Sequence, residues 1–379
     1  MQFKLTEDQL QIQKLARDFA EKELIVDLEE RDEESRFDRA LYNKMVAQGF
    51  SGLCFEEKYG GVELDYMTYI LAVEELSKVD DGMAISLSAT VSLAASPIEA
   101  FGTEEQKEKF LVPLVEGTKM GAFGLTEANA GTDAGSQQTV ALLDGDNYIL
   151  NGSKMFITNA GEAEIYVVLA MTDKSKGARG ITAFIVEKDT PGFTFGKKEN
   201  KMGIRTSITM ELVFQDCIIP VANRLGKEGE GFKVAMQTLD GGRIGVAAQA
   251  LGIATAALDH AVKYSKERQQ FGKPISANQG VAFMLADMAV EVEAARLLVY
   301  QAAWCKQNGL PYAKEAAMAK LFASDVAMKV STDAVQVFGG YGFSKEYPVE
   351  RLMRNAKITQ IYEGTNQVQR MVISASILR

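Results

Sequence analysis

The sequence has few of the residues that most often carry enzyme chemistry at neutral pH. Its 379 residues include one histidine, His260, and three cysteines, Cys54, Cys217 and Cys305, none of which forms a Cys-x-x-Cys pair. An odd number of scattered cysteines supports neither a disulfide framework nor a zinc site, and no metal is expected. Unpaired thiols are typical of a reducing compartment, so a cytoplasmic location is expected.

The sequence also lacks a long apolar run and an excess of positive charge. No stretch of 18 apolar residues occurs, and Met1 to Leu5 is not a basic-then-apolar leader, so neither a membrane span nor an export signal is expected. Lys and Arg number 41 against 51 Asp and Glu, a net charge of −10 that argues against nucleic acid as a partner. A small molecule or another protein is the expected partner.

Residues 1–120 have helical periodicity throughout. Thr6 with Gln9, and Thr103 with Gln106, have the spacing of capping boxes at helix starts. Apolar stripes at helical spacing follow these starts. The expected helices cover residues 6–25, 38–48, 65–78, 83–101 and 103–116. This region is predicted to be an all-helical N-terminal domain.

Residues 121–225 change to short β-branched and aromatic runs separated by Gly, Asn, Asp and Pro. The expected strands cover residues 147–150, 154–158, 165–172, 182–187, 193–195 and 210–214, with Asn151-Gly152 as a hairpin turn. No helix-length segment lies between these strands, which favours an antiparallel β-barrel or sandwich over a parallel sheet. A Rossmann unit is correspondingly not expected.

Residues 226–379 return to helical periodicity. Segments 232–265, 278–308, 313–338 and 348–378 have the lengths and short connections of a four-helix bundle, and their many alanines allow close approach of the helices. The chain is therefore predicted to be an α+β protein with three domains, at 1–120, 121–225 and 226–379.

Five segments carry residues suited to chemistry. In Ile361 to Gln367, Glu363 lies between Tyr362 and Gly364 and is a candidate proton-abstracting base, although most glutamates are simply surface residues. The glycine-rich segment 121–136 offers backbone N–H groups to a phosphate at Gly131 and Thr132 and a hydroxyl at Thr126, although an ordinary turn has the same composition.

The other three segments are less specific taken singly. Phe156 and Thr158 would share one face of a strand and contact a flavin, or Phe156 would be a core residue. Arg268, near the end of a helix, suits a pyrophosphate, and the glycines of segment 336–342 allow a nucleotide to approach the backbone. A solvated charge and a helix C-cap are the alternatives for these last two segments.

Taken together and in this order, the five segments resemble the acyl-CoA dehydrogenase family over essentially the whole chain. The resemblance is closest to the short-chain, butyryl-CoA dehydrogenase-like members, and it includes Leu239 to Gly245 and Lys357 to Asn366. It implies a flavoprotein with FAD between the β-domain and the C-terminal bundle, a homo-oligomer that is usually a tetramer, and electron exchange with electron-transferring flavoprotein.

The resemblance also assigns site residues. Phe123, Leu125, Thr126, Phe156 and Thr158 would contact the flavin ring, Gly131 and Thr132 would lie near its phosphates, and Thr365 and Gln367 would also bind the cofactor. Arg268, Gln270, Phe271, Gln336, Val337, Gly339 and Gly340 would hold the adenosine diphosphate part of the FAD of a neighbouring subunit. Asp240, Arg243, Tyr362 and Gly364 would contact the acyl-CoA or enoyl-CoA substrate.

In the reaction that this resemblance implies, Glu363 takes the thioester α-proton while the β-hydride leaves for FAD. Many relatives have tryptophan where this chain has Phe156, which removes an indole N–H donor. The position that holds an alternative base in some relatives is Gly242 here, so Glu363 has no rival by this similarity.

Two other interpretations stay open. The same scaffold would serve a branched or aryl-acrylyl thioester, as an enoyl-CoA reductase, because the Met, Ala and Ser residues of segment 85–97 can shape several cavities. A catalytically silent flavin and acyl-CoA binding component of a flavoprotein complex is the third interpretation. Reduction of bound flavin by butyryl-CoA without oxygen would separate catalysis from binding alone.

Overall fold

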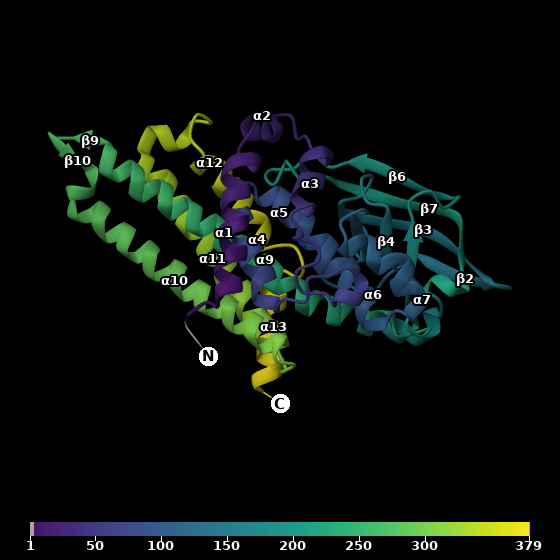
Figure 1. The fold of residues 1–379 in the computed structure, drawn as a ribbon. Helices are drawn as coiled ribbons and strands as arrows, with labels where there is room; N and C mark the ends of the chain where they lie inside the picture. Colours follow the sequence, from purple (N-terminus) through teal and green to yellow (C-terminus); the bar gives the residue numbers. More distant parts are fainter. Residues whose placement is uncertain (1–3, 379) are drawn as a thin grey trace.

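The mixed β-sheet lies at one end of the molecule, and the long C-terminal helices lie at the other (Figure 1). The computed structural model describes residues 4–378. The N-terminal helices are α1 Glu7–Phe19, α2 Leu28–Glu33, α3 Arg39–Val46, α4 Tyr66–Ser77, α5 Asp81–Ser88, α6 Ser96–Phe101, α7 Glu104–Gln106 and α8 Val112–Val115, extended by π-helical segments η1 Ala20–Leu24, η3 Ala89–Ala95 and η4 Lys107–Leu111. Both predicted capping boxes are present.

The sheet is built from strands β1 Gly121–Gly124, β2 Val140–Asp144, β3 Asn147–Thr158, β4 Ile165–Met171, β5 Ile181–Glu187, β6 Phe193–Lys198, β7 Thr209–Pro220 and β8 Arg224–Leu225. Their order is β6-β7-β3-β2-β4-β5-β8, with β1 beside β4. Most neighbours are antiparallel, as predicted, but β4 pairs in parallel with both β1 and β2. The sheet is therefore mixed.

The hairpin turn predicted at Asn151-Gly152 is wrong, because both residues lie inside β3. The chain turns instead at Gly145, between β2 and β3, where φ is +58°. Gly152 serves a close approach within the sheet, since a Cβ there would lie 2.6 Å from the Thr139 Oγ1 atom. The register of β3 against β7 shifts between Leu150 and Gly152. An Asn-Gly pair thus marks a bulge here rather than a turn.

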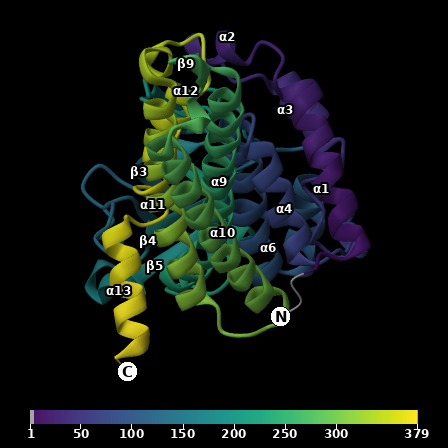
Figure 2. The ribbon, with the colours of Figure 1, turned by 90° about the vertical axis from the view of Figure 1, so that its left-hand side faces the viewer.

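The C-terminal helices are α9 Gly231–Glu267, α10 Gln279–Gln307, α11 Ala313–Phe338, α12 Val349–Thr359 and α13 Asn366–Ile377. In Figure 2, α9 to α12 pack side by side, while α13 lies apart from α1 and α4. The predicted single helix over 348–378 is wrong, because residues 360–365 separate α12 from α13. A short β-hairpin, β9 Gln269–Gln270 with β10 Lys273–Pro274, joins α9 to the segment before α10.

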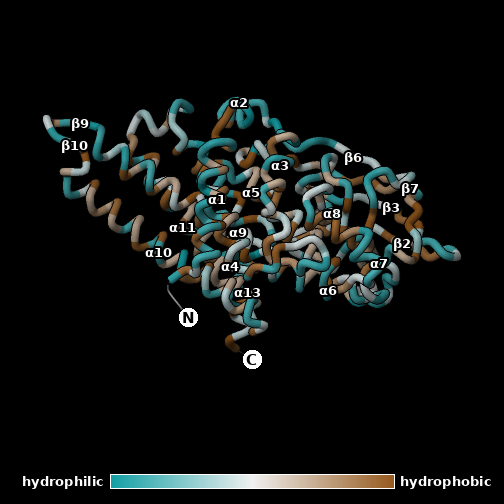
Figure 3. Tube along the Cα trace, viewed as in Figure 1, coloured by the Kyte–Doolittle hydropathy of each residue, from teal (hydrophilic) through white to brown (hydrophobic). Residues whose placement is uncertain are grey.

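Helix α9 is the central element, since it packs against α4, α5, α10, α11 and α12. Two helical stretches, residues 81–101 and Gly231–Glu267, have the length and apolar composition of a membrane span. Their most apolar windows are 72% and 83% buried inside the protein, which is the pattern of core helices. Figure 3 shows hydrophilic segments at the periphery, including α2, whereas α10 alternates between hydrophobic and hydrophilic residues.

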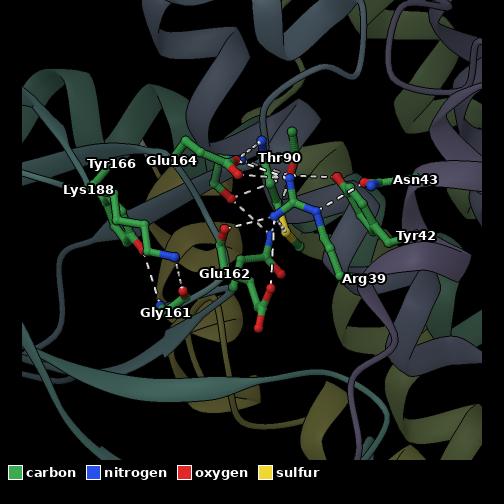
Figure 4. A network of polar contacts seen from close by, with 12 residues as sticks. Arg39, Tyr42, Asn43, Thr90, Gly161, Glu162, Glu164, Tyr166 and Lys188 are labelled. Atoms are coloured by element: carbon green, nitrogen blue, oxygen red, sulfur yellow. Dashed lines mark hydrogen bonds and ion pairs between the residues drawn. The ribbon is translucent and has the colours of Figure 1, made fainter.

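A polar network joins the helical domain to the sheet (Figure 4). Arg39 of α3 donates to the Glu162 carbonyl at 2.8 Å and to the Glu164 carboxylate at 2.9 Å, just before β4. Glu164 also accepts from the Met120 N–H at 2.7 Å, at the start of β1. Because these bonds cross from one domain to the other, they fix α3 against the starts of β1 and β4, where the glycine-rich segment begins.

Candidate active site

The loop between α12 and α13 carries Glu363 in an unusual backbone conformation. Glu363 has φ +51° and Gly364 has φ +91°, so two consecutive residues lie on the left-handed side of conformational space. Glycine adopts this conformation freely, whereas a glutamate loses about 1–2 kcal/mol in it. The chain then enters α13, whose first N–H groups are capped by the Thr365 side chain. This reversal explains why one predicted helix is two.

Buried donors hold the carbonyl groups of this loop. The Gln369 amide donates to the Glu363 carbonyl at 3.3 Å and to the Gly364 carbonyl at 2.7 Å. The Lys320 ammonium of α11 donates to the Gly364 carbonyl at 2.8 Å. The Arg243 Nε of α9 is 3.4 Å from the Glu363 carbonyl. Donors on α9, α11 and α13 therefore hold this strained backbone together. Strained conformations persist in proteins where the surrounding contacts fix them in this way.

The Glu363 carboxylate is aimed into the protein. Its Oε2 atom is buried and has no hydrogen-bond partner among the described residues. A Cβ at Gly242 of α9 would lie 2.2 Å from this atom, so only glycine leaves room for the carboxylate. Burial raises the pKa of Glu363 to about 7, against the opposing effects of Arg243 and Lys320. A carboxylate with such a pKa is matched to proton transfer at neutral pH.

Glu363 lines a cavity of about 470 Å³ to which all three regions of the chain contribute. Its walls include Ile85, Ala89, Leu93, Phe123, Leu125, Thr126, Gly131, Thr132, Phe156, Thr158, Met236, Arg243, Tyr362, Glu363 and Gly364. We call this space the base cavity. Its volume and its mixture of apolar walls with a few polar groups are typical of small-molecule sites.

A bulge in β3 determines how Phe156 reaches the base cavity. The pairing with β7 shifts between Lys154 and Ile157, and Phe156 has φ +60° and a side chain that is 61% exposed. The prediction that Phe156 and Thr158 share one face of a regular strand is wrong in this detail, because the bulge interrupts the alternation. Both residues nevertheless line the cavity. Bulges beside functional sites commonly re-aim a side chain in this way.

A buried ion pair supports the glycine-rich wall of the cavity. The Lys154 ammonium lies 2.7 Å from the Glu127 carboxylate and donates to the Leu125 carbonyl at 3.2 Å. Glu127 also accepts from the N–H groups of Gln138 and Thr139 at 2.6 and 3.0 Å. This cluster therefore pins both ends of the segment that contains Thr126, Gly131 and Thr132.

Tyr362 closes the inner side of the loop formed by residues 360–365, which we call the base loop. Its hydroxyl donates to the Gln249 side chain, whose amide donates in turn to the Asp81 carbonyl at 3.2 Å. Burial raises the pKa of Tyr362 well above its usual value. The ring packs with Ile85 and Val246. Tyr362 is thus a neutral, fixed wall beside the carboxylate.

A second pocket, of about 620 Å³, lies where α9 and α11 end and is lined by Tyr264, Arg268, Gln270, Ile275, Val337, Phe338, Gly339, Gly340, Tyr341, Ser344 and Glu346. We call it the helix-end pocket. Its Arg268 guanidinium lies 5.4 Å from the centre of the Tyr341 ring. Gly339 has φ +60°, and a Cβ there would touch nothing within 4 Å.

The two pockets collect most of the predicted site residues. The base cavity brings together Phe123, Leu125, Thr126, Gly131, Thr132, Phe156, Thr158, Arg243, Tyr362, Glu363 and Gly364. The helix-end pocket brings together Arg268, Gln270, Val337, Gly339 and Gly340. Asp240, Phe271, Gln336, Thr365 and Gln367 line neither. Asp240 pairs with Arg243 at 2.6 Å, and Phe271 is 95% exposed.

Sequence reasoning missed Lys320, Gln369, Lys154 and Glu127, which support the two walls of the base cavity. A signal existed for Lys320, because it lies on the buried stripe of α11 at helical spacing from Ala316 and Ala323. A lysine on an apolar stripe needs a partner. Lys154 had no comparable signal, since its carboxylate partner is 27 residues away. Among residues 4–378 no cluster of side chains suits a metal ion.

Comparisons with known proteins agree over the whole chain. Residues 6–118, 122–217 and 229–378 match the N-terminal, middle and C-terminal domains of acyl-CoA dehydrogenase. A short-chain specific acyl-CoA dehydrogenase of Megasphaera elsdenii is 64% identical over 100% of both sequences. The solved butyryl-CoA dehydrogenase from Megasphaera elsdenii has a TM-score of 0.99 at 64% identity, covering 100% of both chains. A chain in a structure described as an electron transferring flavoprotein of Acidaminococcus fermentans, addressing flavin-based electron bifurcation, has a TM-score of 0.99 at 66% identity, with 100% of both chains covered.

Proposed function

The chain belongs to the acyl-CoA dehydrogenase family, and we propose that it interconverts a short-chain acyl-CoA such as butyryl-CoA with its enoyl-CoA. The observation that carries this proposal is the Glu363 carboxylate, which lines the base cavity and whose Oε2 atom is buried without a hydrogen-bond partner among the described residues. The 64% identity to a short-chain specific relative supports the choice of a short acyl group.

Glu363 serves as the base that removes the α-proton of the thioester. Its pKa of about 7 leaves a large share of it ionised at neutral pH while keeping it basic enough to accept a proton. The developing enolate needs a hydrogen-bond donor at the thioester oxygen. The backbone N–H of Glu363 makes no hydrogen bond to any described residue, so it is available for this role.

The base cavity fits the FAD that members of this family bind. Phe156 offers a ring face, Thr126 and Thr158 offer hydroxyls, and a Cβ at Gly131 would meet nothing within 4 Å, which leaves space for a bulky group. We assign Phe123, Leu125, Thr126, Phe156 and Thr158 to the flavin ring, Gly131 and Thr132 to its phosphates, and Thr365 and Gln367 to the cofactor. When bound, FAD accepts the hydride from the substrate β-carbon.

The substrate side of the site consists of Asp240, Arg243, Tyr362 and Gly364 in our proposal. Arg243 is 4% exposed and contacts both Asp240 and the Glu363 carbonyl. Its role is to fix the base loop and the thioester arm of the substrate. The apolar residues Ile85, Ala89 and Leu93 surround the acyl chain and exclude water from the reacting carbons.

The helix-end pocket binds the adenosine diphosphate part of FAD from a neighbouring subunit, through Arg268, Gln270, Phe271, Gln336, Val337, Gly339 and Gly340, in a homotetramer. Exposure supports assembly, because Phe283, Val290 and Leu297 recur every seven residues on α10 and are all exposed. Large apolar side chains in such a stripe usually pack against a partner.

We further propose electron-transferring flavoprotein as the electron partner and the cytoplasm as the location. A solved chain 66% identical to this one comes from work on an electron transferring flavoprotein, which supports the partner. All three cysteines are free, as in a reducing compartment. We keep the domain boundaries at 120/121 and 225/226, because the chain changes from helix to strand and back at these points.

Anaerobic titration of the purified holoprotein with acyl-CoA thioesters of increasing length tests this function. Butyryl-CoA should bleach the flavin absorbance, and long or aryl-substituted thioesters should do so less well. Binding of butyryl-CoA without bleaching would instead support a silent binding component. Faster bleaching by a branched thioester than by butyryl-CoA would show that the protein prefers a branched acyl group.

A further inference from the structure

We propose that Lys320 is the positioning residue of the base, because its buried ammonium group locks the loop that carries Glu363 and supplies the positive charge that keeps the Glu363 carboxylate ionised. This inference deepens the proposed function and rests on it. Lys320 does not line the base cavity and belongs to none of the segments with a sequence signature, so its role follows from its contacts.

Lys320 is buried on α11 and contacts both the base loop and the start of α13. The side chain is 0% exposed and lies on the stripe of α11 that includes Ala316 and Ala323. Its Nζ atom donates to the Gly364 carbonyl at 2.8 Å and to the Asn366 side-chain oxygen at 3.0 Å. One ammonium group therefore ties α11 to the residue after the base and to the first residue of α13.

Loop geometry alone does not require a charge at this place. Neutral donors already serve the same carbonyls, since Gln369 donates to both Glu363 and Gly364. Burying an ammonium group has a large desolvation penalty, which nearby negative charge can offset. Lys320 donates to a carbonyl and an amide oxygen and forms no ion pair among the described residues. The carboxylates that favour its charged form are Glu363 and, with a smaller effect, Asp325, which accepts from the same Asn366 side chain at 2.8 Å. Its charge is consequently left to act on the nearby base.

Two cations, Arg243 and Lys320, act on the Glu363 carboxylate, and they differ in their own ion-pair partners. Arg243 of α9 forms an ion pair with Asp240 at 2.6 Å. Lys320 of α11 has no such partner. Tyr66 and Tyr69 of α4 face the carboxylate as neutral groups, because burial raises the pKa of each above its usual value. Both cations lower the pKa of Glu363, Arg243 more than Lys320, and Lys320 is the one of the two that makes no ion pair among residues 4–378.

The directions of the pKa shifts agree with this arrangement. Burial lowers the pKa of Lys320 to about 7, and the Glu363 carboxylate opposes that shift. Burial raises the pKa of Glu363 to about 7, and Lys320 opposes that shift. Each charged form thus stabilises the other, and removing the ammonium group must raise the pKa of Glu363 further.

The test replaces Lys320 and follows flavin reduction by butyryl-CoA against pH in the holoprotein. Lys320→Met removes the charge and the donor, Lys320→Gln removes the charge but retains a donor, and Lys329→Met removes a lysine from the exposed side of the same helix as a control. In both Lys320 variants, the midpoint of the acidic limb should rise by about one pH unit, with a rate about fivefold lower at pH 7 that recovers at pH 9. Lys329→Met should keep the wild-type midpoint.

An unchanged midpoint in Lys320→Gln, with flavin bound, would overturn the charge role. If Lys320→Met does not fold, Lys320→Gln still gives the decisive profile. An uncharged variant with a wild-type rate at every pH would overturn the positioning role as well. Failure of the proposed function looks different, since the wild-type protein itself would then not bleach with any thioester, or its acidic limb would persist in Glu363→Gln.

Discussion

The base cavity and the helix-end pocket differ in completeness. The base cavity takes its walls from all three regions of one chain, and buried groups such as Lys320 and Lys154 hold those walls in place. The helix-end pocket takes its walls only from the ends of α9 and α11 and the residues that follow them, and the flanking Phe271 is 95% exposed. One pocket combines walls from all three regions of the chain, whereas the other is confined to the ends of two helices.

This difference suggests a test, in which catalysis and FAD binding are expected to depend on different parts of the protein. The groups proposed to move a proton lie in the pocket that all three regions of one chain line. The groups proposed to hold the distal part of FAD lie in a pocket open to a second copy. Retention of FAD should therefore depend on assembly. Variants in the base cavity should change the reaction rate, whereas variants in the helix-end pocket should change the affinity for FAD.

The largest effect is expected from Glu363→Gln. Removing the base should slow flavin reduction by butyryl-CoA by about 10²- to 10⁴-fold, because general-base catalysis contributes about that much. The variant should remain yellow and should still bind the thioester, as measured by anaerobic stopped-flow and by spectral perturbation of the flavin. Glu21→Gln, at an exposed position on the π-helical segment η1, is the matched control. A Glu363→Gln enzyme within tenfold of wild type would rule out this residue as the base.

A smaller loss is expected from Gly242→Ala. The added Cβ would lie 2.2 Å from the Glu363 Oε2 atom, so the carboxylate must move away from its present position. Misplacement of a reacting group by about 1 Å lowers rates by about 10²-fold. Gly280→Ala on α10, where a Cβ meets nothing within 4 Å, should keep the wild-type rate. Equal rates in the two variants would show that the carboxylate has more freedom than its surroundings indicate.

Arg268→Met should weaken the affinity for FAD and leave the chemistry intact. The loss of a charge-assisted contact corresponds to about 10- to 100-fold in the dissociation constant. Turnover with saturating FAD should match wild type, because Arg268 lies in the helix-end pocket and not in the base cavity. Lys266→Met, in the last turn of α9 just before Arg268, is the control. If turnover fell while FAD affinity was unchanged, the contrast between the two pockets would be lost.

The smallest effect concerns stability against pH. The pKa of Glu363 is about 7 in the folded protein, above its ordinary value of 4.5. The folded state therefore binds this proton more tightly than the unfolded state, and the resulting stabilisation is lost as pH rises from about 4.5 through 7. The stability of Glu363→Gln, which cannot titrate, should therefore rise relative to wild type by about 3 kcal/mol between pH 4.5 and pH 8. Urea unfolding at the two pH values measures this difference, and a constant difference would contradict the shift.

Much of the fold could be predicted from the sequence because periodicity reports burial directly. The helix predicted over 313–338 matches α11, and the capping boxes at Thr6 and Thr103 are present. The failures occur where backbone conformation and tertiary contacts decide. Asn151-Gly152 has the composition of a turn but lies in a long strand, because Gly152 serves a close approach to Thr139.

The same limit applies to the site. Glu363 was identifiable from its segment, but the break between α12 and α13 was not, because it depends on a positive φ at a glutamate. Donors from helices distant in sequence stabilise that conformation. The Lys154–Glu127 pair joins residues with no local pattern to mark them. Patterns in sequence therefore reveal the reacting group more readily than the groups that hold it.

The central claim, that Glu363 is the base, is tested most directly by hydrogen exchange in a thioester that cannot be dehydrogenated. Acetyl-CoA has no β-carbon to release a hydride, so exchange of its methyl hydrogens with deuterium from heavy water reports proton removal alone. The wild-type holoprotein should accelerate this exchange well above the buffer rate, and Glu363→Gln should not. Equal acceleration by the two proteins would contradict the assignment.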